Sequence, residues 1–384
     1  MGAGIVSSDD DRAVFQALGL GERVFSRGHR VKASFGADVT GLAWYKVRDA
    51  LLEGLEGHVQ LGAPVARVAR DGGEFVVTTA GGEVHRARML VGSDGYFSRV
   101  RRDLFAGGAA DLVYANACSI RGVVDLDALP ADVAERSRVM KWAASGGEGS
   151  PVGPGALMLR YPVSETEACW TVTVQQHLLD ELGVAVPAGE RLRGNPAWRD
   201  LPADDGAKKA RATALVSAFA GREDFRELEA CIAGTWGSIV EGAVATLDPA
   251  AAATGPVPLH DGAAVLVGDA AHPCRPIGIG LTLGMEDAWA LGSAVAEHGV
   301  GEPAAEAYAA ARQLRVRSTI LHSMVHAENN YRRQSLGPGE GYAVEAGGEV
   351  WTEERTGAWY REEKGKFYDG LVPLDEVEGA PGLC

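Results

Sequence analysis

The stretch Ala263–Leu291 has the sequence AAVLVGDAAHPCRPIGIGLTLGMEDAWAL and decides the fold. It opens with the apolar run AAVLV, which is typical of a buried parallel strand. A loop with two prolines and two glycines follows. From Leu281 onward the apolar residues recur at helical spacing. The pattern predicts a strand, a glycine-containing polar loop and a helix, in that order.

This order suits a ligand site. The start of a helix leaves backbone N–H groups without partners, and the helix dipole makes that end positive. Glycines let a planar or anionic ligand approach the backbone, because no Cβ stands in the way. Asp269, at the end of the predicted strand, is placed to accept hydrogen bonds from ligand hydroxyls. A plain connection made of turn residues would explain any one of these glycines, but not the whole arrangement.

The stretch resembles the second FAD-binding motif of the single-component flavin-dependent aromatic hydroxylases, the p-hydroxybenzoate hydroxylase-like family. The matching residues are Gly268-Asp269-Ala270-Ala271-His272, Pro276, Gly278-x-Gly280 and Glu286-Asp287-Ala288. The resemblance implies that the aspartate holds the ribityl chain of FAD, that the proline lies beside the isoalloxazine ring, and that the helix start faces the pyrimidine edge. It assigns these cofactor-binding residues: Gly268, Asp269, Pro276, Gly278, Gly280, Leu281 and Thr282. Ile279 and Thr282 depart from the usual glutamine and asparagine.

A second motif precedes it in the order expected for the family. Residues 91–101, VGSDGYFSRVR, again place a glycine and an aspartate after a short strand, with Ser98 near the start of a helix. They resemble the family's Asp-Gly motif, which implies that Asp94 and Gly95 serve FAD and the pyridine nucleotide. Since both motifs follow strands, we expect Asp94-Gly95 and Asp269 with the Gly278–Gly280 loop to form the walls of one cleft.

The start of the chain does not fit a dinucleotide fingerprint. Gly2-x-Gly4 has no strand before it, and Ser7 stands where the third glycine belongs. Residues 2–24 instead resemble the part of the hydroxylases that follows the first βαβ unit, where a glycine-rich turn leads into a helix. The resemblance implies that the first strand, the GxGxxG loop and the first helix are absent. We therefore expect the chain to retain little FAD, as an incomplete gene product, a truncated chain or a diverged protein.

Composition narrows the function classes. The chain has 384 residues with 37 basic and 52 acidic side chains, and its formal net charge of −15 argues against a nucleic-acid or anionic-membrane surface. No apolar run approaches the length of a membrane helix. Five scattered cysteines without a CxxC pair indicate a reducing compartment, so we expect a cytoplasmic protein unless a targeting segment precedes Met1. Cys274, inside the loop, is interpreted as a buried inert thiol.

The remaining patterns set the domain organisation. Short runs within 65–91 predict a β-meander. Residues 111–255 combine β-like runs, a Gly/Ser/Pro loop at 143–155 and a helical region at 207–233. We expect an α/β fold: a Rossmann-like FAD/NAD(P)-binding domain, N-terminally incomplete, with an inserted β-rich α+β substrate domain. The expected bounds are 1–110 and 256–334 for the FAD-binding domain, 111–255 for the substrate domain and 335–384 for a C-terminal tail.

The resemblance implies a FAD-dependent monooxygenase. It would use NAD(P)H and O2 to hydroxylate or epoxidise a small organic substrate, aromatic or polyketide/isoprenoid-like. Because the flavin carries such chemistry, no catalytic base is assigned; His272 is the one candidate, and a structural role fits it better. His322 and His326 are interpreted as a packing pair without a metal. The alternative from another class is a flavoprotein remnant without catalysis that acts as a binding module. The sequence leaves the oligomeric state open.

Overall fold

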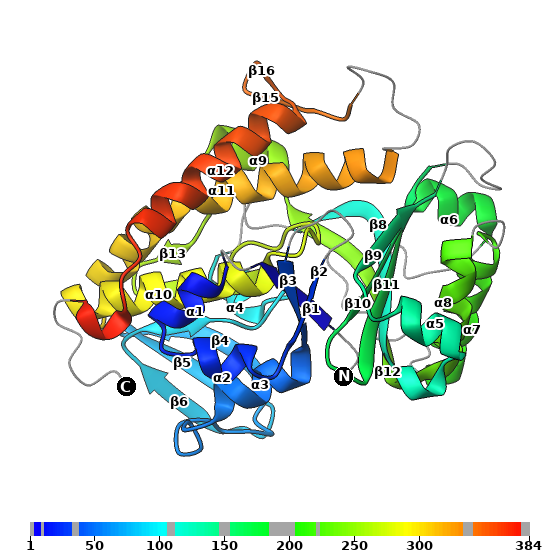
Figure 1. Ribbon diagram of the computed structural model, residues 1–384. Coiled ribbons are helices and arrows are strands. Elements are labelled where there is room, and N and C mark those ends of the chain that lie inside the picture. Colours follow the sequence, from blue (N-terminus) through cyan, green and yellow to red (C-terminus); the bar gives the residue numbers. More distant parts are fainter. Residues whose placement is uncertain are drawn as a thin grey trace.

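The computed structural model describes residues 4–8, 11–32, 38–105, 112–145, 154–183, 204–219, 223–332 and 341–377. Gly2, most of the predicted 143–155 loop and Cys384 lie outside them. Two lobes stand side by side in Figure 1. One is built on a large antiparallel sheet, and the other on the long helices near the C-terminus and the small sheets beneath them.

The large sheet has five strands in the order β12-β8-β11-β10-β9. Their bounds are β8 Leu112–Asp125, β9 Lys141–Ala144, β10 Ala156–Pro162, β11 Glu167–Gln175 and β12 Thr235–Leu247. Four helices accompany it: α5 Ala131–Arg136, α6 Gln176–Leu182, α7 Asp205–Ser217 and α8 Glu223–Gly234. The predicted β-rich segment with a helical region is therefore present, although the region 207–233 consists of two helices.

The two faces of this sheet differ in chemistry. One face packs against α7 and α8, with Ile120, Trp170 and Met158 fully buried among them. The indole N–H of Trp170 donates to the Thr235 hydroxyl at 2.8 Å, so the one polar atom of this large side chain is satisfied. Because side chains alternate along a strand, the neighbouring residues Arg121 and Thr171 point to the other face, where they remain partly exposed.

The predicted parallel strand is present in a second, smaller sheet. β14 (Ala264–Leu266) pairs in parallel with β7 (Leu90–Gly92) and antiparallel with the short β13 (His260–Asp261). All three residues of β14 are completely buried, as an apolar parallel strand requires. The meander is also present as β4 (Val65–Asp71), β5 (Glu74–Thr79) and β6 (Val84–Ala87). The run 83–91 does not form one strand, because β7 leaves the meander to pair with β14.

Long helices cover the parallel pair. α10 (Gly280–His298) follows the glycine loop, as predicted, and α11 (Glu302–Arg332) packs along it. α9 (Pro249–Thr254), which falls within the expected substrate segment, packs on α11. The core between these helices and β14 is made mainly of small residues, among them Ala290, Ala304 and Ala305, which allow close packing of the helices on the strand.

The N-terminal segment differs from the expectation. Residues Gly4–Ser8 form a strand, β1, and not a glycine-rich turn. β1 pairs with β3 (Asp38–Ala43), which also pairs with β2 (His29–Lys32). The predicted helix follows as α1 (Arg12–Ala17), with α2 (Gly21–Phe25) and α3 (Trp44–Leu52) beside it. β1 forms because Gly4 fits closely against the large sheet, where its N–H donates to Cys169 Sγ at 3.2 Å.

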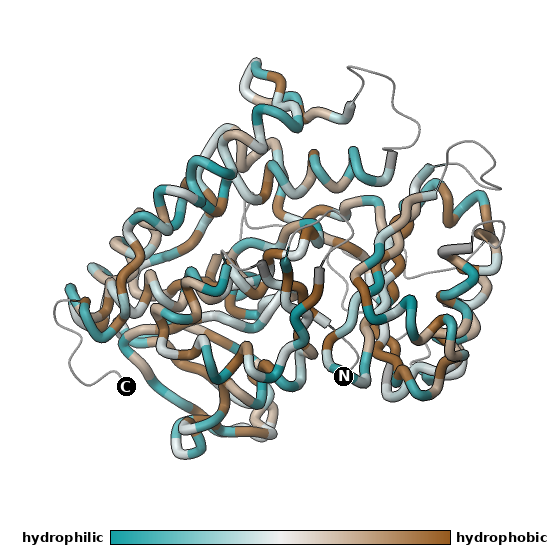
Figure 2. The backbone as a smooth tube through the Cα atoms, viewed as in Figure 1, coloured by the Kyte–Doolittle hydropathy of each residue, from teal (hydrophilic) through white to brown (hydrophobic). Residues whose placement is uncertain are grey.

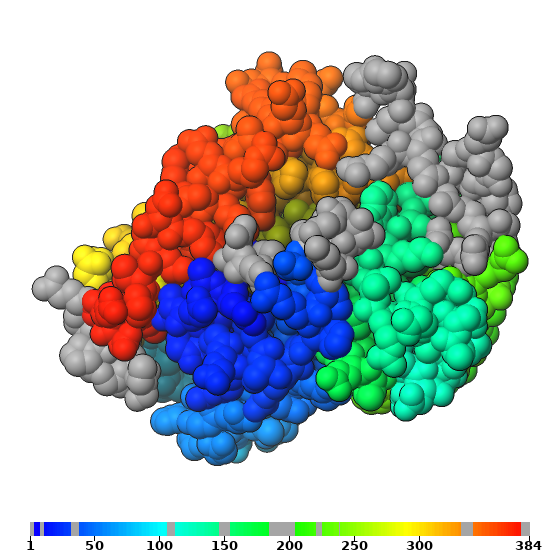
Figure 3. Space-filling view, in the orientation of Figure 1, coloured from blue at the N-terminus to red at the C-terminus, as the bar shows by residue number. Residues whose placement is uncertain are grey.

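The C-terminal segment packs on the lobe with the long helices. A hairpin of β15 (Val344–Ala346) and β16 (Glu349–Trp351) leads into α12 (Glu353–Asp369), which lies along α11. α12 is mainly hydrophilic in Figure 2, and its contacts are aromatic rings and polar groups more than aliphatic side chains. Figure 3 shows this red segment beside the blue N-terminal one, where Lys364 pairs with Asp11 at 3.0 Å.

α4 (Arg99–Leu104) completes the helices near the two motifs. Along the described residues, no helix combines the length and the apolar composition needed to cross a membrane.

The junction of α11 and α12 should respond to pH. The ring of His322 stacks on Tyr360, with centroids 5.0 Å apart, and lies beside His326. Burial, followed by the neighbouring His326, lowers the pKa of His322 to about 4. The lowered pKa means that the folded protein favours the neutral form of His322. The contribution of this histidine to the free energy of unfolding is therefore complete above pH ~6.5 and is lost as the pH falls toward ~4.

We therefore expect the free energy of unfolding in urea to fall by about 1–2 kcal/mol more in the parent than in His322→Gln between pH 7 and pH 4.5. The control is His58→Gln at an exposed position. If the parent and His322→Gln show the same pH profile, the neutral histidine does not stabilise the junction.

Candidate functional site

The two sequence motifs meet at one edge of the parallel pair. Leu266 of β14 lies opposite Gly92 of β7, and the N–H of Val267 donates to the Gly92 carbonyl at 3.0 Å. Both chains then turn outward on the same side. The arrangement confirms the expectation that the two turns share a sheet edge, which follows from the parallel pairing of the strands that precede them.

Arg101 of α4 joins the two turns. This buried side chain donates through Nη1 to the Ala270 carbonyl at 2.6 Å and through Nη2 to the Tyr96 carbonyl. The Tyr96 hydroxyl in turn donates to the carbonyl of Cys274. Arg101 lies in the second motif, but its role could not be predicted from the sequence, because its acceptors are backbone carbonyls that any residue would supply.

Asp94 caps the helix that follows it. Its carboxylate accepts the Arg99 N–H at 2.6 Å, the Val100 N–H at 3.2 Å and the Ser98 hydroxyl. A carboxylate at this position also interacts favourably with the helix dipole. The Asp94 side chain therefore caps the N-terminus of α4. Beside it, Gly95 has φ of +79°, which lets the chain turn.

The second turn is fixed from behind by Asp287 of α10. One carboxylate oxygen accepts the Gly268 N–H at 2.7 Å and contacts His272 Nε2 at 2.5 Å. His272 is only 1% exposed and Asp287 is completely buried. The imidazole thus has no surface for a ligand, which supports the structural role and not the catalytic one.

Two arginines of α11 complete this buried cluster. Arg312 pairs with Asp287 at 2.7 Å and with Glu286 at 2.8 Å, and Arg315 pairs with both oxygens of Glu286 at 3.0 Å. Tyr308, one turn earlier, donates to the Leu266 carbonyl at 2.8 Å. Through these contacts α11 holds β14 and the start of the turn.

Charge in the cluster is balanced locally. Burial alone would raise the pKa of Asp287, but the adjacent His272 and Arg312 and the Gly268 N–H lower it to about 2. The carboxylate therefore remains ionised and holds its donors over the whole neutral range.

In contrast, the carboxylate of Asp269 has no hydrogen-bond partner among the described residues. It lies at the open side of the turn and faces the start of α10, where a Cβ on Gly280 would lie 3.9 Å from Asp269 Oδ1. That helix end has no side-chain cap, so the first N–H groups of α10 are free to donate. Burial raises the pKa of Asp269, and the charges of His272, Arg121 and Arg101 oppose that rise.

The loop between these groups needs its glycines. Gly268 and Gly278 have φ of +58° and +87°, a region that other residues rarely adopt, and neither has a neighbouring atom where a Cβ would stand. Pro276, Gly278 and Gly280 are exposed, Leu281 is partly buried, and Thr282 is buried. The first three thus line an open surface, while Thr282 contributes a backbone N–H and not an accessible hydroxyl.

Other predicted features near the site have structural roles. Cys274 is buried, and burial raises the pKa of its thiol to about 12, which fits the inert thiol expected from the sequence. His322 and His326 form the packing pair already described. Among the described residues, no group of three or more His, Cys, Asp or Glu side chains could hold a metal ion.

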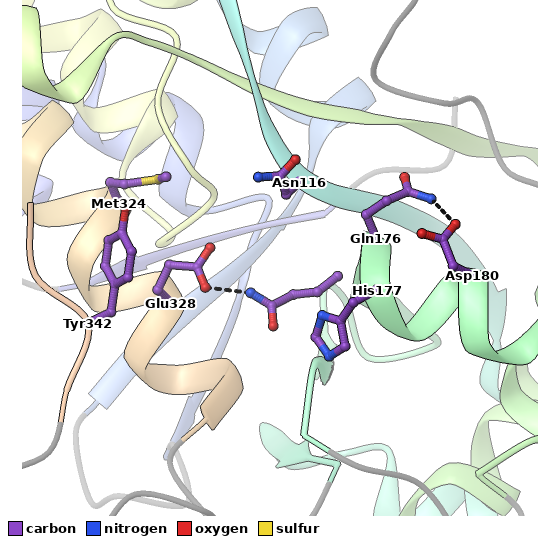
Figure 4. Close-up of a pocket in the computed structure, with 8 residues that line it drawn as sticks. Asn116, Gln176, His177, Asp180, Met324, Glu328 and Tyr342 are labelled. Carbon is purple, nitrogen blue, oxygen red and sulfur yellow. Dashed lines mark hydrogen bonds between the residues drawn. The ribbon is translucent and has the colours of Figure 1, made fainter.

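A polar cavity of about 390 Å³ opens between the large sheet and α11 (Figure 4). Gln175 Nε2 donates to Glu328 across it at 2.5 Å, and Gln175 Oε1 finds no hydrogen-bond partner among the residues that the structure describes. Asn116, on the wall formed by β8, has φ of +49°, which is uncommon outside glycine. Gln175 lies on the same sheet face as Arg121, four residue pairs farther along the β8–β11 ladder. The cavity therefore marks one end of that face.

Comparison with known proteins shows which solved structures share this fold. No family model and no curated protein matches the chain. Among solved structures, a variant of HpxO from Klebsiella pneumoniae in complex with FAD matches with a TM-score of 0.62 and 20% identity, over 96% of this chain and 88% of that one. The chain has the fold of FAD-dependent aromatic hydroxylases.

Two further structures support this assignment of the fold. The 2,6-dihydroxypyridine-3-hydroxylase of Arthrobacter nicotinovorans has a TM-score of 0.65 and 17% identity, over 88% of this chain and 85% of that one. PqsL of P. aeruginosa in complex with 2-aminobenzoylacetate has a TM-score of 0.58 and 21% identity, over 87% of each chain. At these identities the likeness concerns the fold.

The buried cluster should be essential to stability. We expect Arg312→Met to lower the free energy of unfolding by about 3–5 kcal/mol, because it removes the arginine partner of the buried Asp287 and one of the two arginine partners of Glu286. The control Arg355→Met removes an exposed pair with Glu349 and should cost less than about 1 kcal/mol. Urea unfolding monitored by circular dichroism measures both, and equal losses would contradict a special role for the cluster.

Proposed function

We propose that the protein is a FAD-dependent monooxygenase that transfers one oxygen atom from O2 to a small organic substrate, with NAD(P)H as the reductant. The observation that carries the proposal is the open side of the second turn. There, the unpartnered carboxylate of Asp269 faces the uncapped start of α10 across a loop of exposed glycines.

The residues present fit the flavin half of FAD. The ribityl chain carries hydroxyl donors, which Asp269 is placed to accept. The pyrimidine edge of the isoalloxazine ring carries carbonyl acceptors, which suit the N–H groups of Gly280, Leu281 and Thr282 at the positive end of a helix. Pro276, Gly278 and Gly95 offer the flat, unobstructed surface that a planar ring needs. FAD would supply the electron transfer and the activation of oxygen.

The protein's own residues would then position and shield the reactants. In the proposed division, 1–110 and 256–334 bind FAD, 111–255 bind the substrate, and 335–384 form a C-terminal tail, of which α12 lies along α11. The substrate would occupy the space between the open face of the large sheet and the glycine loop. Among structures with this fold, HpxO is seen in complex with uric acid and PqsL in complex with 2-aminobenzoylacetate, which favours a small aromatic or similar compound.

One observation supports the alternative, a binding module without catalysis. Gly4 is unsuited to cradle a pyrophosphate, because a Cβ there would lie 2.6 Å from Cys169 and 2.9 Å from Tyr161. Gly4 therefore packs directly against the large sheet, and there is no room beside it for a cofactor. Under this alternative the chain would bind a small molecule in the same cleft but would not retain FAD.

Assays on the purified protein distinguish the two proposed functions. The oxygenase should bind added FAD, seen as quenched flavin fluorescence, and should oxidise NADH or NADPH with matching O2 consumption. A panel of phenols, aromatic acids and polycyclic ketones, each with product analysis for an added oxygen atom, tests the substrate class. Absence of FAD binding at micromolar cofactor would contradict the oxygenase and favour the binding module.

Asp269 provides the sharper test at the level of one residue. We expect Asp269→Ala to weaken FAD binding by about ten- to a hundredfold, because a charge-assisted hydrogen bond contributes roughly 1.5–3 kcal/mol. Fluorescence titration measures the dissociation constant. Asp261→Ala, an exposed aspartate beside β13, is the control and should leave it unchanged. Equal affinities of the parent and Asp269→Ala would mean that this carboxylate does not hold the ribityl chain.

A further inference from the structure

Strand β8 has a bulge where it borders the polar cavity. Its register with β12 shifts there, so that the three residues 115–117 lie opposite Val244 alone. Asn116, in the middle of the bulge, has φ of +49° and is the one non-glycine residue with a positive φ in the described part of the chain. Bulges re-aim side chains and are frequent beside binding sites. Here the bulge presents Asn116 on the wall of the cavity (Figure 4).

Arg275 fixes the walls of this cavity. The residue precedes Pro276 of the glycine loop and is completely buried. Its Nη2 donates to the carbonyl of Ala115 in the bulge and pairs with Glu328 of α11 at 2.5 Å. One side chain thus connects the bulge, the loop and α11. The cavity is therefore bounded by specific contacts between the two lobes.

Gln175 contributes an unsatisfied acceptor to the cavity. The residue is only 4% exposed, and its Nε2 donates to Glu328 at 2.5 Å. Because a carboxylate accepts and does not donate, the amide nitrogen must face Glu328 and Oε1 must face elsewhere. Oε1 is buried and finds no hydrogen-bond partner among the described residues. A buried acceptor of this kind is costly unless a donor reaches it, which indicates a ligand with N–H or O–H groups.

The other polar groups of the cavity are also mainly acceptors. Asp180 accepts from Gln176 Nε2 at 2.8 Å and makes no ion pair along the described chain. His177 Nε2 lies 3.0 Å from the carbonyl of Pro154, which can only accept, so the N–H of the neutral ring is already used. No lysine or arginine is among the residues that line the cavity. The lining therefore carries two carboxylates, of which only Glu328 has a cationic partner in the described structure.

The two carboxylates lie on opposite sides of the cavity in Figure 4, Glu328 on α11 and Asp180 on α6. Met324 and Tyr342 add an apolar surface on the side of Glu328. The cavity volume of about 390 Å³ is sufficient for a small ligand. A ligand that matches this arrangement carries a positive charge at each end and methylene groups between them.

We propose that the cavity binds a small aliphatic diamine. One ammonium group donates to Gln175 Oε1 and to Glu328, and the other reaches Asp180. Asn116 adds its amide oxygen, and the methylene groups lie against the apolar surface. Ammonium groups suit this site because each carries three N–H donors and no acceptor, whereas a hydroxyl brings lone pairs of its own. Binding here needs no flavin, so the inference goes beyond the proposed function.

The experiment compares three ligands of the same chain length. The probes are 1,4-diaminobutane, 4-amino-1-butanol and 1,4-butanediol, titrated by calorimetry into the purified protein without added FAD at pH ~7.5, where primary amines are protonated. The parent should bind the amino alcohol about tenfold more tightly than the diol, because a charge-assisted hydrogen bond replaces a neutral one. The diamine should gain a further factor of about two to five from the exposed carboxylate of Asp180.

Variants of the lining assign each part of this preference. Asp180→Asn should remove the advantage of the diamine over the amino alcohol and leave the affinity for the amino alcohol unchanged. Asn116→Gly tolerates the positive φ and should weaken all three probes by a similar factor of about two to ten, because a neutral hydrogen bond is lost. Gln175→Met should weaken both amines about tenfold. Asp205→Asn, at an exposed aspartate of α7, is the matched control and should change no affinity.

Melting temperatures check that each variant is folded, and Asp180→Asn with Asn116→Gly carries the test if Gln175→Met is not. The proposal is overturned if the parent binds the diol as tightly as the amines, if the diamine has no advantage in the parent, or if that advantage survives in Asp180→Asn. An equal loss in Asp205→Asn would also overturn it, because the attraction would then come from the overall negative charge of the protein.

The titrations contain no FAD, so this proposal and the oxygenase function can fail separately. Selective diamine binding by a chain that does not bind FAD upholds the cavity as a ligand site and contradicts the oxygenase. FAD binding without diamine selectivity contradicts the role of the cavity and leaves the oxygenase standing.

Discussion

The carboxylate of Asp287 is the contact on which the rest of the site depends. It lies completely buried in α10 and holds the Gly268 N–H, His272 and Arg312 at once. Three consecutive segments of the chain therefore meet at one group: the turn after β14, the helix that follows the glycine loop, and α11. Since a buried charge is tolerated only with such partners, each segment can take its place only when the others are present. This arrangement also holds Asp269 in position. Because Asp287 makes the contacts that stabilise the turn, the carboxylate of Asp269 has no hydrogen-bond partner among the described residues.

The sequence predicted this part of the molecule well, for physical reasons. The run AAVLV can only be buried, Gly268 and Gly278 need positive φ, and the helix after Gly280 has a regular apolar spacing. Each of these signals is local, so it can be read from a few adjacent residues. The order of the two motifs then predicted a shared sheet edge, and the pairing of Leu266 with Gly92 confirms it. The roles of individual residues toward FAD stay predictions.

Contacts between distant segments could not be predicted in the same way. Residues 2–24 were expected to begin with a glycine-rich turn, from their resemblance to the hydroxylases, but residues 4–8 form β1. The fit of Gly4 against Cys169 depends on a strand 165 positions away. The sequence also did not indicate which residues lie on each face of the large sheet, because β8 and β11 are long runs with few charged residues. The register that places Arg121 opposite Thr171 shows which residues share the sheet face turned away from α7 and α8. The C-terminal helix gave no signal, because its surface is hydrophilic and its contacts are made by rings over arginines.

Those rings have a consequence for the electrostatics of the whole lobe. Phe367 covers the guanidinium of Arg312 at 4.9 Å, and Tyr360 covers that of Arg315 at 4.6 Å, so the rings of α12 exclude water from above the charges beneath them. Attraction between buried ions weakens as the dielectric constant around them rises. A cut or frayed α12 would admit water above Arg312 and weaken its hold on Asp287, two contacts away from the glycine turn. The C-terminal helix thus acts on the turn indirectly. By keeping water away from Arg312, it preserves the ion pair with Asp287, and Asp287 in turn holds Gly268.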